Sequence, residues 1–286
     1  MIQILSTYSG NFLVPQARPG WRSKGVPPGG PADPFLAGLA LGLAGSDFAL
    51  ELTAPVIVQS DSPVLVYLSA PVGSAMLPGH PLAALAAIPL LPGEPLSLNA
   101  PHSGFRAYLS WDGMGAGRRF ATPLEPGMGF FSAGSGTGGR LVLLDPPVPP
   151  EMPDHLRYIP VGDPAVFDAV ATPMADRVGS RFRGQTPDFS PLARSEPSFH
   201  GAVQVAPGGE FLIHGPDGPT LGGYPKIGAV IAADLPVLAQ IRPGQKVVLE
   251  PMTADGASVA RLARQELLAS SLARARNALA IAGIRP

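Results

Sequence analysis

The chain has 286 residues, a formal net charge of −1 and only 14% charged residues. It lacks the basic field that would displace counterions from a phosphate backbone, so we expect no nucleic-acid partner. Cysteine is absent, which excludes disulfide bonds, thiolate chemistry and cysteine-ligated zinc. The hydrophobic fraction of 45% supports a folded core, and the 35 glycines and 36 prolines, without a Gly-X-Y period, indicate many turns between short strands.

The N-terminal residues 1–5 hold no basic residue and no long apolar stretch, so we expect no signal peptide. The longest apolar run, residues 81–92, is interrupted by Pro89 and falls short of the roughly 18 residues that a membrane-spanning helix needs. We therefore expect a soluble, cytoplasmic protein with no membrane partner.

Residues 1–14 predict two short strands around a Ser-Gly-Asn turn. The following segment, residues 18–35, has almost no hydrophobic periodicity and contains the cations Arg18, Arg22 and Lys24. Four glycines and one carboxylate accompany them. Structured loops of this kind often carry function.

A helix is predicted after this loop, with Asp33 as N-cap, Pro34 as first residue and Gly45 at its end. Apolar residues recur inside it at helical spacing: Phe35, Leu36, Leu39, Ala40 and Leu43.

From residue 49 onward, short apolar or alternating runs predict strands of a barrel or sandwich. The predicted strands are residues 49–53, 56–59, 63–68, 95–98, 105–111 and 140–144. The alternation in 95–98 and 105–111 predicts one solvent-exposed face for each. The glycine-rich residues 134–139 predict a flexible turn. Because the proline run 146–150 cannot join a sheet interior, it predicts a boundary between residues 1–146 and 147–286, each expected to form a β subdomain.

The second half repeats the β pattern. We predict strands at residues 156–160, 201–205, 211–214 and 245–250, a capped short helix at 163–167 and a charged turn and strand at 176–184. A long helix is predicted for residues 255–280. One stripe along it contains Val259, Leu262, Ala263, Glu266 or Leu267, and Ser270.

Residues 219–240 are the most informative stretch. Residues 220–225 predict a turn, 227–232 a buried strand, and Asp234 caps a helical turn that contains Pro236. In the turn, two adjacent glycines have no side chain, so another group can approach the backbone closely. An aromatic hydroxyl and a cation flank them. Spacing alone favours a tight strand-to-strand turn on which the tyrosine simply packs, and the alternative is a binding site.

Other catalytic signatures are missing. The five histidines are scattered, and no helix carries the His-Glu-x-x-His spacing of zinc enzymes. The sequence also lacks a Gly-x-Ser-x-Gly elbow, a Walker P-loop and a Met-Lys-Met biotin attachment site. If the chemistry needs ATP or a covalently carried cofactor, a partner must supply it.

Seven cations lie on glycine-flanked loops or turns of this weakly charged chain: Arg18, Arg22, Lys24, Arg177, Arg181, Arg183 and Lys226. Such cations can hold a carboxylate or a carboxyphosphate-like anion. Alternatively, they pair with Asp33, Asp176 and Glu51 and merely order the loops. The sequence leaves both interpretations open.

Several of these segments together resemble the allophanate hydrolase subunit 2 / KipI antagonist family, which includes the C subunit of 5-oxoprolinase. In the first half the similar segments are residues 18–21, 25–33, 39–46 and 50–53. In the second half they are residues 175–184, 201–206, 220–227 and 233–240, of which the last two match closely. Two segments depart from the family pattern. Residues 115–120 stand where the family has Gly-Ser-Arg-Ser-Thr-Tyr, and residues 29–32 replace its Ser-Gly-Ala-Met.

The resemblance implies a mainly β fold of two cyclophilin-like β-barrel subdomains with a few short helices and a C-terminal helix. It implies a subunit 1/KipI-like partner and, for 5-oxoprolinase, a third component, the A subunit. That complex opens 5-oxoproline to glutamate with ATP, and the chain would be a non-autonomous subunit of this amide-ring hydrolase. Two alternatives remain open. One is a non-catalytic regulatory protein that binds a KipI-like kinase inhibitor, and the other is the carboxyltransferase part of a urea carboxylase-like enzyme. In each case we expect no covalently bound cofactor and no metal, with ATP, or biotin carried by a partner, entering only through the complex.

We expect one cleft to bind a small anionic substrate. The catalytic candidates are Tyr224, Lys226 and Arg177. The substrate-binding candidates are Arg18, Lys24, Asp33, Gln204, Thr220, Gly222 and Gly223. Cations would hold the substrate carboxylate, backbone N–H groups of the glycine pair would stabilise an oxyanion, and Tyr224 or Lys226 would move protons.

Overall fold

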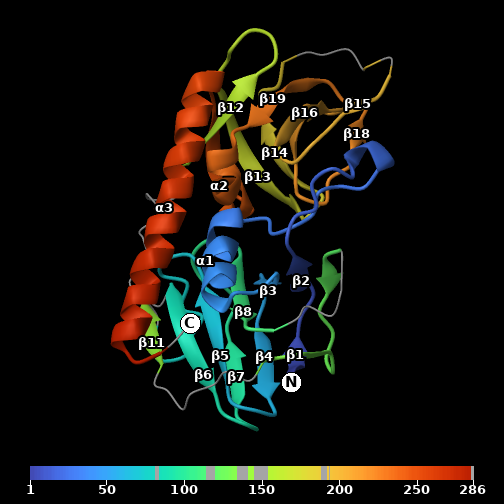
Figure 1. The fold of residues 1–286 in the computed structure, drawn as a ribbon. Coiled ribbons are helices and arrows are strands. Elements are labelled where there is room, and N and C mark those ends of the chain that lie inside the picture. Colours follow the sequence, from blue (N-terminus) through green and yellow to red (C-terminus); the bar gives the residue numbers. More distant parts are fainter. Residues whose placement is uncertain are drawn as a thin grey trace. The chain divides into compact units, whose positions relative to one another are not determined.

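The computed structural model describes residues 1–80, 84–113, 120–133, 141–144, 154–187, 192 and 194–284. The chain divides into two compact units (Figure 1). The first unit comprises Met1–Gln16, Pro34–Val148 and Glu266–Pro286, and the second comprises Ala17–Asp33 and Pro149–Gln265. The loop of residues 17–33 is therefore part of the second unit, although it belongs to the first half of the sequence. The predicted boundary between residues 146 and 147 and the glycine-rich segment 134–139 lie outside the described residues.

The first unit contains two antiparallel sheets. The smaller sheet has the strand order β10-β1-β4-β7, and the larger has the order β11-β6-β5-β8-β3-β2-β9. The strands of the smaller sheet are β1 (Ile2–Thr7), β4 (Val56–Ser60), β7 (Pro95–Leu98) and β10 (Gly129–Phe130). Those of the larger sheet are β2 (Phe12–Pro15), β3 (Phe48–Leu52), β5 (Val64–Ser69), β6 (Leu85–Leu90), β8 (Ala107–Trp111), β9 (Thr122–Pro123) and β11 (Val142–Leu144).

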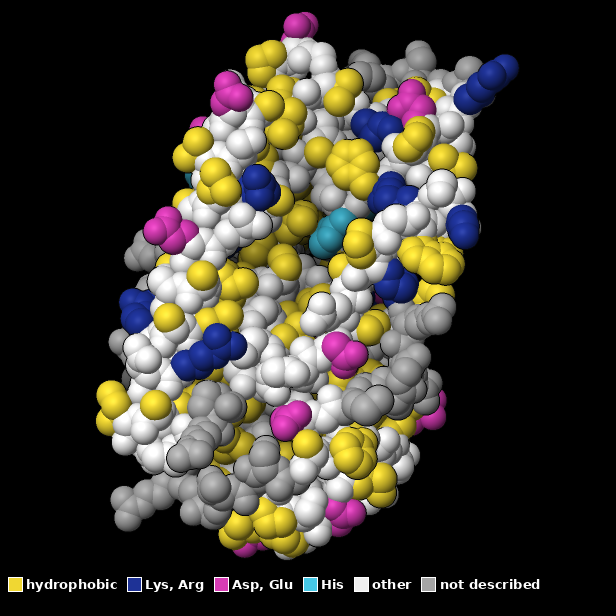
Figure 2. All heavy atoms as spheres, in the orientation of Figure 1, with side chains coloured by type: hydrophobic (Ala, Val, Ile, Leu, Met, Phe, Trp, Pro, Cys, Tyr) yellow, Lys and Arg dark blue, Asp and Glu magenta, His cyan; other side chains and the backbone are white. Residues whose placement is uncertain are grey.

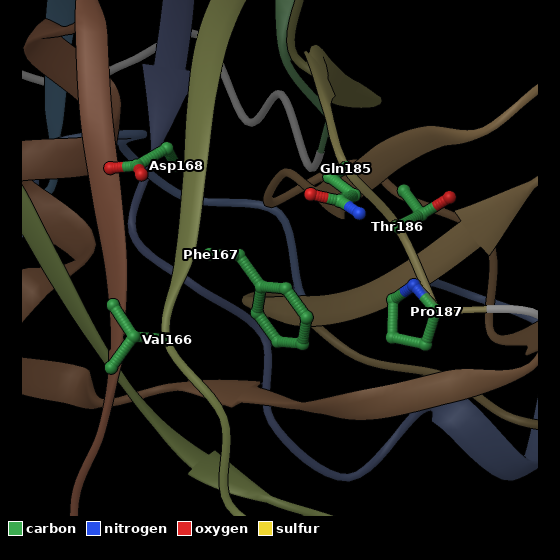
Figure 3. A pocket seen from close by; sticks show the side chains of 6 residues that line it. All are labelled: Val166, Phe167, Asp168, Gln185, Thr186 and Pro187. Atoms are coloured by element: carbon green, nitrogen blue, oxygen red, sulfur yellow. The ribbon is translucent and has the colours of Figure 1, made fainter.

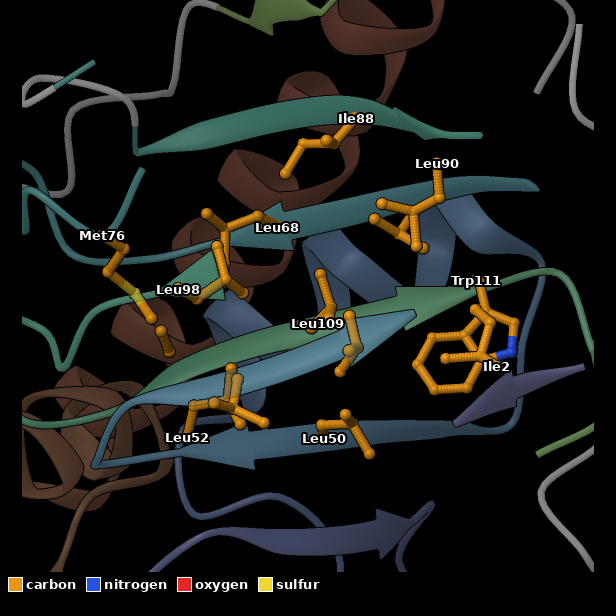
Figure 4. Close-up of a cluster of buried hydrophobic side chains, with 14 of the residues drawn as sticks. Ile2, Leu50, Leu52, Leu68, Met76, Ile88, Leu90, Leu98, Leu109 and Trp111 are labelled. Carbon is orange, nitrogen blue, oxygen red and sulfur yellow. The ribbon is translucent and has the colours of Figure 1, made fainter. Parts of the chain in front are cut away.

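One hydrophobic core fills the space between these two sheets (Figure 4). Alternate residues of the longer strands point into it, as the two-residue period of a β-strand requires. Phe48, Trp111 and Phe130 form an aromatic group at one end, with ring centroids 5.2–6.3 Å apart.

The other face of the larger sheet is covered by α1 (Pro34–Ala44), with residues from the C-terminal part of α3 (Ala254–Ile281) in the same cluster. This second layer explains why β3, β5 and β8 are buried on both faces. The prediction of a solvent-exposed face for residues 105–111 is therefore wrong, because the alternation does not reveal the helix that covers the polar side. The same prediction is confirmed for β7, which has exposed residues.

The second unit is a closed barrel with the strand order β12-β19-β16-β17-β14-β13-β20. All its neighbouring strands are antiparallel except β12 and β20, whose parallel pairing closes the barrel. Its strands are β12 (His155–Pro160), β13 (Phe167–Ala175), β14 (Gly179–Gly184), β16 (Ala202–Ala206), β17 (Glu210–His214), β19 (Lys226–Val230) and β20 (Lys246–Pro251). Its remaining elements are η1 (Arg22–Lys24), the short pair β15 (Glu196–Pro197) and β18 (Leu221–Gly222), η2 (Ala232–Asp234) and α2 (Leu235–Gln240).

Apolar residues from all these barrel strands form the core of the second unit, which α2 joins with Val237 and Leu238. Asp234 stands at the predicted N-cap of α2 but makes no side-chain cap hydrogen bond. Its carboxylate instead accepts hydrogen bonds from the backbone N–H and Nε of Arg157, each at 2.9 Å. Residues 163–167 do not form the predicted helix, because Phe167 already belongs to the long strand β13.

The long C-terminal helix is confirmed, but the stripe identified along it faces solvent. Val259 and Leu262 are 67% and 56% exposed. Buried residues such as Ala257, Ser271 and Leu279 lie on the opposite face. Within the described ranges, no helix is long and apolar enough to cross a membrane.

The structure thus confirms a mainly β chain with a closed barrel, a few short helices and a long C-terminal helix. The central strands follow the predicted ranges closely in both halves.

Candidate functional site

The loop formed by residues 17–33 is fixed to the barrel of the second unit by several hydrogen bonds. The backbone N–H of Gly29 donates to the carbonyl of Pro216 at 3.0 Å. At the end of the loop, the buried carboxylate of Asp33 accepts a hydrogen bond of 2.7 Å from Nε2 of Gln240. Within the loop, the backbone N–H and guanidinium of Arg18 donate to the carbonyls of Pro28 and Pro27.

Arg177 provides the strongest of these attachments. Its side chain is buried, its Nε donates to Oδ2 of Asp217 at 2.7 Å, and one terminal nitrogen donates to the carbonyl of Gly30 at 2.6 Å. Charge-assisted hydrogen bonds of this length are stronger than neutral ones. The guanidinium therefore anchors the loop. For Arg177, this favours the interpretation that the cation orders a loop over the interpretation that it binds an anion.

The glycine turn lies beside the short sheet of β15 and β18, in which Glu196 pairs with Gly222. Lys226 ties the turn to this sheet, because its ammonium donates to the carbonyl of Pro197 at 2.7 Å and lies 2.9 Å from Oε2 of Glu196. Tyr224 is 38% exposed, so its ring does not pack fully onto the turn. The turn thus holds Tyr224 at the surface, whereas the side chain of Lys226 is largely buried, with 15% exposed.

Three buried polar side chains lie behind this turn. Oγ of Ser198 is 2.7 Å from Nδ1 of His214, and Nε2 of His214 is 2.9 Å from Oε1 of Gln204. The Nε2 of Gln204 then donates to the carbonyl of Tyr224 at 3.1 Å. Sequence reasoning selected Gln204 but missed Ser198 and His214. Their separations along the chain match no motif, and only the closed barrel brings them together.

Burial lowers the pKa of His214, and the positive charges of Arg22 and Lys226 lower it further. The imidazole is therefore neutral near pH 7.

The loop of residues 17–33 carries two further cations, Arg22 and Lys24. Arg22 lies over the ring of Phe199 at 5.8 Å, and Lys24 over the ring of Trp21 at 4.9 Å. On the face drawn in Figure 2, Lys and Arg side chains gather over the region that holds β15, β18 and η1 in Figure 1. Chemically, this surface can hold a small anion beside the bare backbone of the glycine turn.

All ten predicted site residues belong to the second unit. The six of the turn and strand, Gln204, Thr220, Gly222, Gly223, Tyr224 and Lys226, form one group. Arg18, Asp33 and Arg177 belong to the attachment of the loop 17–33, and Lys24 is exposed in η1.

The sequence left open that the seven loop cations pair with Asp33, Asp176 and Glu51, but the structure shows other ion pairs. Arg177 pairs with Asp217 and Lys226 with Glu196. Arg181 and Arg183 share Glu210, whose pKa they lower. The carboxylate of Asp176 caps its own turn by accepting the backbone N–H groups of Val178 and Gly179, and Glu51 lies near Arg106 in the first unit.

The outer wall of the barrel has two hollows that share Asp168. One, of about 440 Å³, is lined by Val166–Asp168 and Gln185–Pro187 (Figure 3). There Phe167 points toward Thr186 and Pro187, whereas Asp168 points to the opposite side of its strand. The other hollow, of about 450 Å³, extends toward Lys246. Arg183, one of the seven loop cations, lines the second hollow, but none of the ten catalytic and substrate-binding candidates is among the residues that line either one. Across the described residues, no three His, Asp or Glu side chains are grouped so that they could hold a metal ion.

Comparison with known proteins gives one curated relative. A stretch of 89 residues is 43% identical to the C subunit of 5-oxoprolinase from Haemophilus influenzae and covers 30% of this chain and 29% of the relative. The chain therefore matches less than a third of that protein's length.

Solved structures share the fold. The urea amidolyase of K. lactis superimposes with a TM-score of 0.79 at 20% identity, over 94% of this chain and 20% of that one. The Kluyveromyces lactis urea carboxylase gives a TM-score of 0.77 at 19% identity, over 94% and 29%. A protein named TTHA0988 gives 0.71 at 24% identity, over 88% and 56%. The chain spans only part of each, and at these identities the likeness concerns the fold alone.

The resemblance inferred from the motifs is confirmed by these matches. The model of the carboxyltransferase domain, subdomains A and B, matches residues 24–119 and 170–251, which is more than half of the chain. The chain belongs to this carboxyltransferase-domain family.

Proposed function

We propose that the chain is a non-autonomous subunit of a 5-oxoprolinase-type complex that opens 5-oxoproline to glutamate. The observation that carries the proposal is the 43% identity to the C subunit of 5-oxoprolinase, together with a cationic surface beside the glycine turn. The substrate of such an enzyme is a small carboxylate with a ring amide, and both features have counterparts here.

In the proposed mechanism, Arg22 holds the substrate carboxylate. Water adds to the ring carbonyl, the C–N bond breaks, and the nitrogen gains a proton to leave an amine and a second carboxylate. The backbone N–H groups near Gly222 and Gly223 stabilise the oxyanion that forms as water adds. Tyr224 or Lys226 moves the proton.

The role of Arg177 changes in this mechanism. Sequence reasoning made it a catalytic candidate, but its side chain is buried, with 6% exposed, and its guanidinium binds Asp217 and the carbonyl of Gly30. We therefore propose that Arg177 holds the loop 17–33 in place and does not contact the substrate.

A subunit 1/KipI-like protein and the 5-oxoprolinase A subunit complete the proposed complex, and ATP is used there. The test is ATP-dependent release of glutamate from 5-oxoproline by the three proteins, with each omitted in turn. Activity that requires all three supports the proposal. In the same assay Lys226→Ala should lower kcat/KM by about 100-fold, in the range of general acid–base effects. The control Lys246→Ala changes an exposed lysine on another strand and should leave the rate unchanged.

A second candidate is the carboxyltransferase part of a urea carboxylase-like enzyme, which the fold shared with Kluyveromyces lactis urea carboxylase favours. Carboxyl transfer between carboxybiotin and urea, with no glutamate released from 5-oxoproline, would replace the first proposal by this one. A tight complex with the subunit 1/KipI-like protein, without either activity, would instead support a regulatory role.

A further inference from the structure

The three side chains behind the glycine turn form a continuous hydrogen-bonded chain that solvent does not reach. Ser198 is 0% exposed, and Gln204 and His214 are each 1% exposed. Three hydrogen bonds of 2.7, 2.9 and 3.1 Å connect them in series to the carbonyl of Tyr224. Buried polar groups are costly unless they are paired, so this chain is a built feature and not a surface accident.

The direction of each hydrogen bond in this row follows from the last one, between Gln204 and the carbonyl of Tyr224. Because a carbonyl only accepts, Gln204 must present its NH2 group to Tyr224 and its oxygen to His214. His214 must then donate from Nε2. Since the imidazole is neutral, its Nδ1 is an acceptor, and Ser198 donates to it. Each group therefore fixes the orientation of the next one.

The row of hydrogen bonds ends at Gln204, beside the glycine turn of the proposed site. A Cβ on Gly222 would lie 2.4 Å from Nε2 of Gln204, so the turn is packed directly on this amide. Gln204 also stands opposite Lys226 in the strand register, next to an irregularity in the ladder between β16 and β19. If the amide of Gln204 turned over, its oxygen would face the carbonyl of Tyr224, and the turn would have to move away.

We propose that Ser198 and His214 are positioning residues: they hold the Gln204 amide in the one orientation that fixes the turn carrying Tyr224 and Lys226. Only the ligand-binding part of the test rests on the proposed function. Ser198 is not a nucleophile in this arrangement, because its side chain is inaccessible to a substrate.

Replacing His214 by Gln or by Asn tests the contacts of its two ring nitrogens one at a time. The amide nitrogen of Gln occupies about the place of Nε2, whereas that of Asn occupies about the place of Nδ1. His214→Gln therefore keeps a donor to Gln204 and alters only the contact with Ser198. His214→Asn keeps a partner for Ser198 and removes the donor to Gln204.

The readout is hydrogen exchange of the backbone amides in residues 221–226 of the full chain, measured by mass spectrometry. We expect His214→Asn to speed this exchange about tenfold, as the loss of one buried hydrogen bond implies, and His214→Gln to leave it near the native rate. Ser198→Ala should give an intermediate effect. In the native protein, ¹⁵N NMR should show the proton of His214 on Nε2.

Exchange at residues 246–251 of β20, which does not contact His214 in the strand pairing, serves as the control for general loosening of the barrel. Equal effects of the Gln and Asn substitutions on the turn, or a proton on Nδ1 in the native protein, would overturn the proposal. Calorimetric titration of the three-protein complex with 5-oxoproline adds a functional readout, with affinity expected to fall for His214→Asn and to survive in His214→Gln. If the native complex releases no glutamate from 5-oxoproline, the proposed function fails, and the exchange data still decide the positioning role.

Discussion

Two buried serines on neighbouring strands of the first unit differ in one respect. Ser69 on β5 and Ser110 on β8 are both 0% exposed. The hydroxyl of Ser110 donates to the carbonyl of Phe48 at 2.8 Å, whereas that of Ser69 has no hydrogen-bond partner among the described residues. A buried hydroxyl without a partner loses its hydration on folding and gains nothing in return.

Ser69→Ala should therefore raise the free energy of unfolding by about 1 kcal/mol, because it removes an unsatisfied polar group. Ser110→Ala is the matched control and should lower that free energy by about 1 kcal/mol, since it removes a made hydrogen bond. Urea denaturation of both variants measures the difference. Equal destabilisation by the two substitutions would show that Ser69 has a partner in solution.

The lowered pKa of His214 predicts a pH dependence of stability. An imidazole whose pKa is lower in the folded chain than its ordinary value of 6.5 binds more protons in the unfolded chain. Its contribution to stability is therefore present above pH 6.5 and is lost as the pH falls toward its folded pKa, with a slope of at most about 1.4 kcal/mol per pH unit.

Denaturation of the native chain and of His214→Gln at several pH values between 7.5 and 5 measures this contribution. The free energy of unfolding of the native chain should fall more steeply on acidification than that of the variant, which has no imidazole there. Parallel curves for the two proteins would mean that His214 titrates alike in the folded and unfolded states.

At the level of elements, α1 and α3 contact each other through small residues within the first unit. Gly38 and Gly42 are one helical turn apart on α1. A Cβ on Gly38 would lie 2.9 Å from a methyl group of Leu268, and one on Gly42 would lie 2.8 Å from both methyl groups of Leu272. Arg276 on α3 also donates to the carbonyl of Gly42 at 2.7 Å, near the C-terminus of α1. The helices thus approach more closely than larger residues would permit.

Gly42→Ile should lower the free energy of unfolding by about 2–3 kcal/mol, because a branched side chain overpacks this contact. Gly42→Ala is the control and should stay within about 1 kcal/mol of the native value. The ends of Leu272 can rotate away from one methyl group, and alanine favours the helix. Thermal unfolding followed by circular dichroism distinguishes the two. A native-like Gly42→Ile would contradict the close contact.

The elements also show what the sequence alone can predict. Apolar runs located the central strands of both units, and Gly45, with a φ of 62°, ends α1 as expected. The interpretation of residues 163–167 as a helix was wrong because local capping signals were outweighed by the pairing of β13 with β14 and β20. On α3, helical spacing identified a real stripe, but periodicity does not say which stripe is buried.

The whole molecule shows a division that the linear sequence does not contain. The loop 17–33 belongs to the second unit, although β2 before it and α1 after it belong to the first. The structure brings together Gln204, Thr220 and Lys226, which the family motifs selected, because they share one sheet and one turn. Ser198 and His214 were missed, because their contact depends on barrel closure, which no local pattern encodes.

This division makes Arg177 important for the fold of the second unit. Arg177 lies in the turn before β14. Its guanidinium binds Asp217 and the carbonyl of Gly30, and so connects that turn to the loop 17–33. Arg177→Ala should lower the free energy of unfolding by about 2–3 kcal/mol. This is less than for a fully buried pair, because Asp217, with 26% of its side chain exposed, can be rehydrated. Arg183→Ala is the control. With 79% of its side chain exposed, Arg183 should contribute less than about 0.5 kcal/mol.

Limited proteolysis of the same variants tests where the loss occurs. If Arg177 anchors the loop, Arg177→Ala should expose the trypsin sites after Arg22 and Lys24 to faster cleavage, while the rate of global unfolding determines cleavage elsewhere. In Arg183→Ala those two sites should be cut at the native rate. Uniformly faster cleavage along the chain of Arg177→Ala would mean that Arg177 stabilises the barrel as a whole, and the loop would then owe its position to Gly29, Asp33 and their partners.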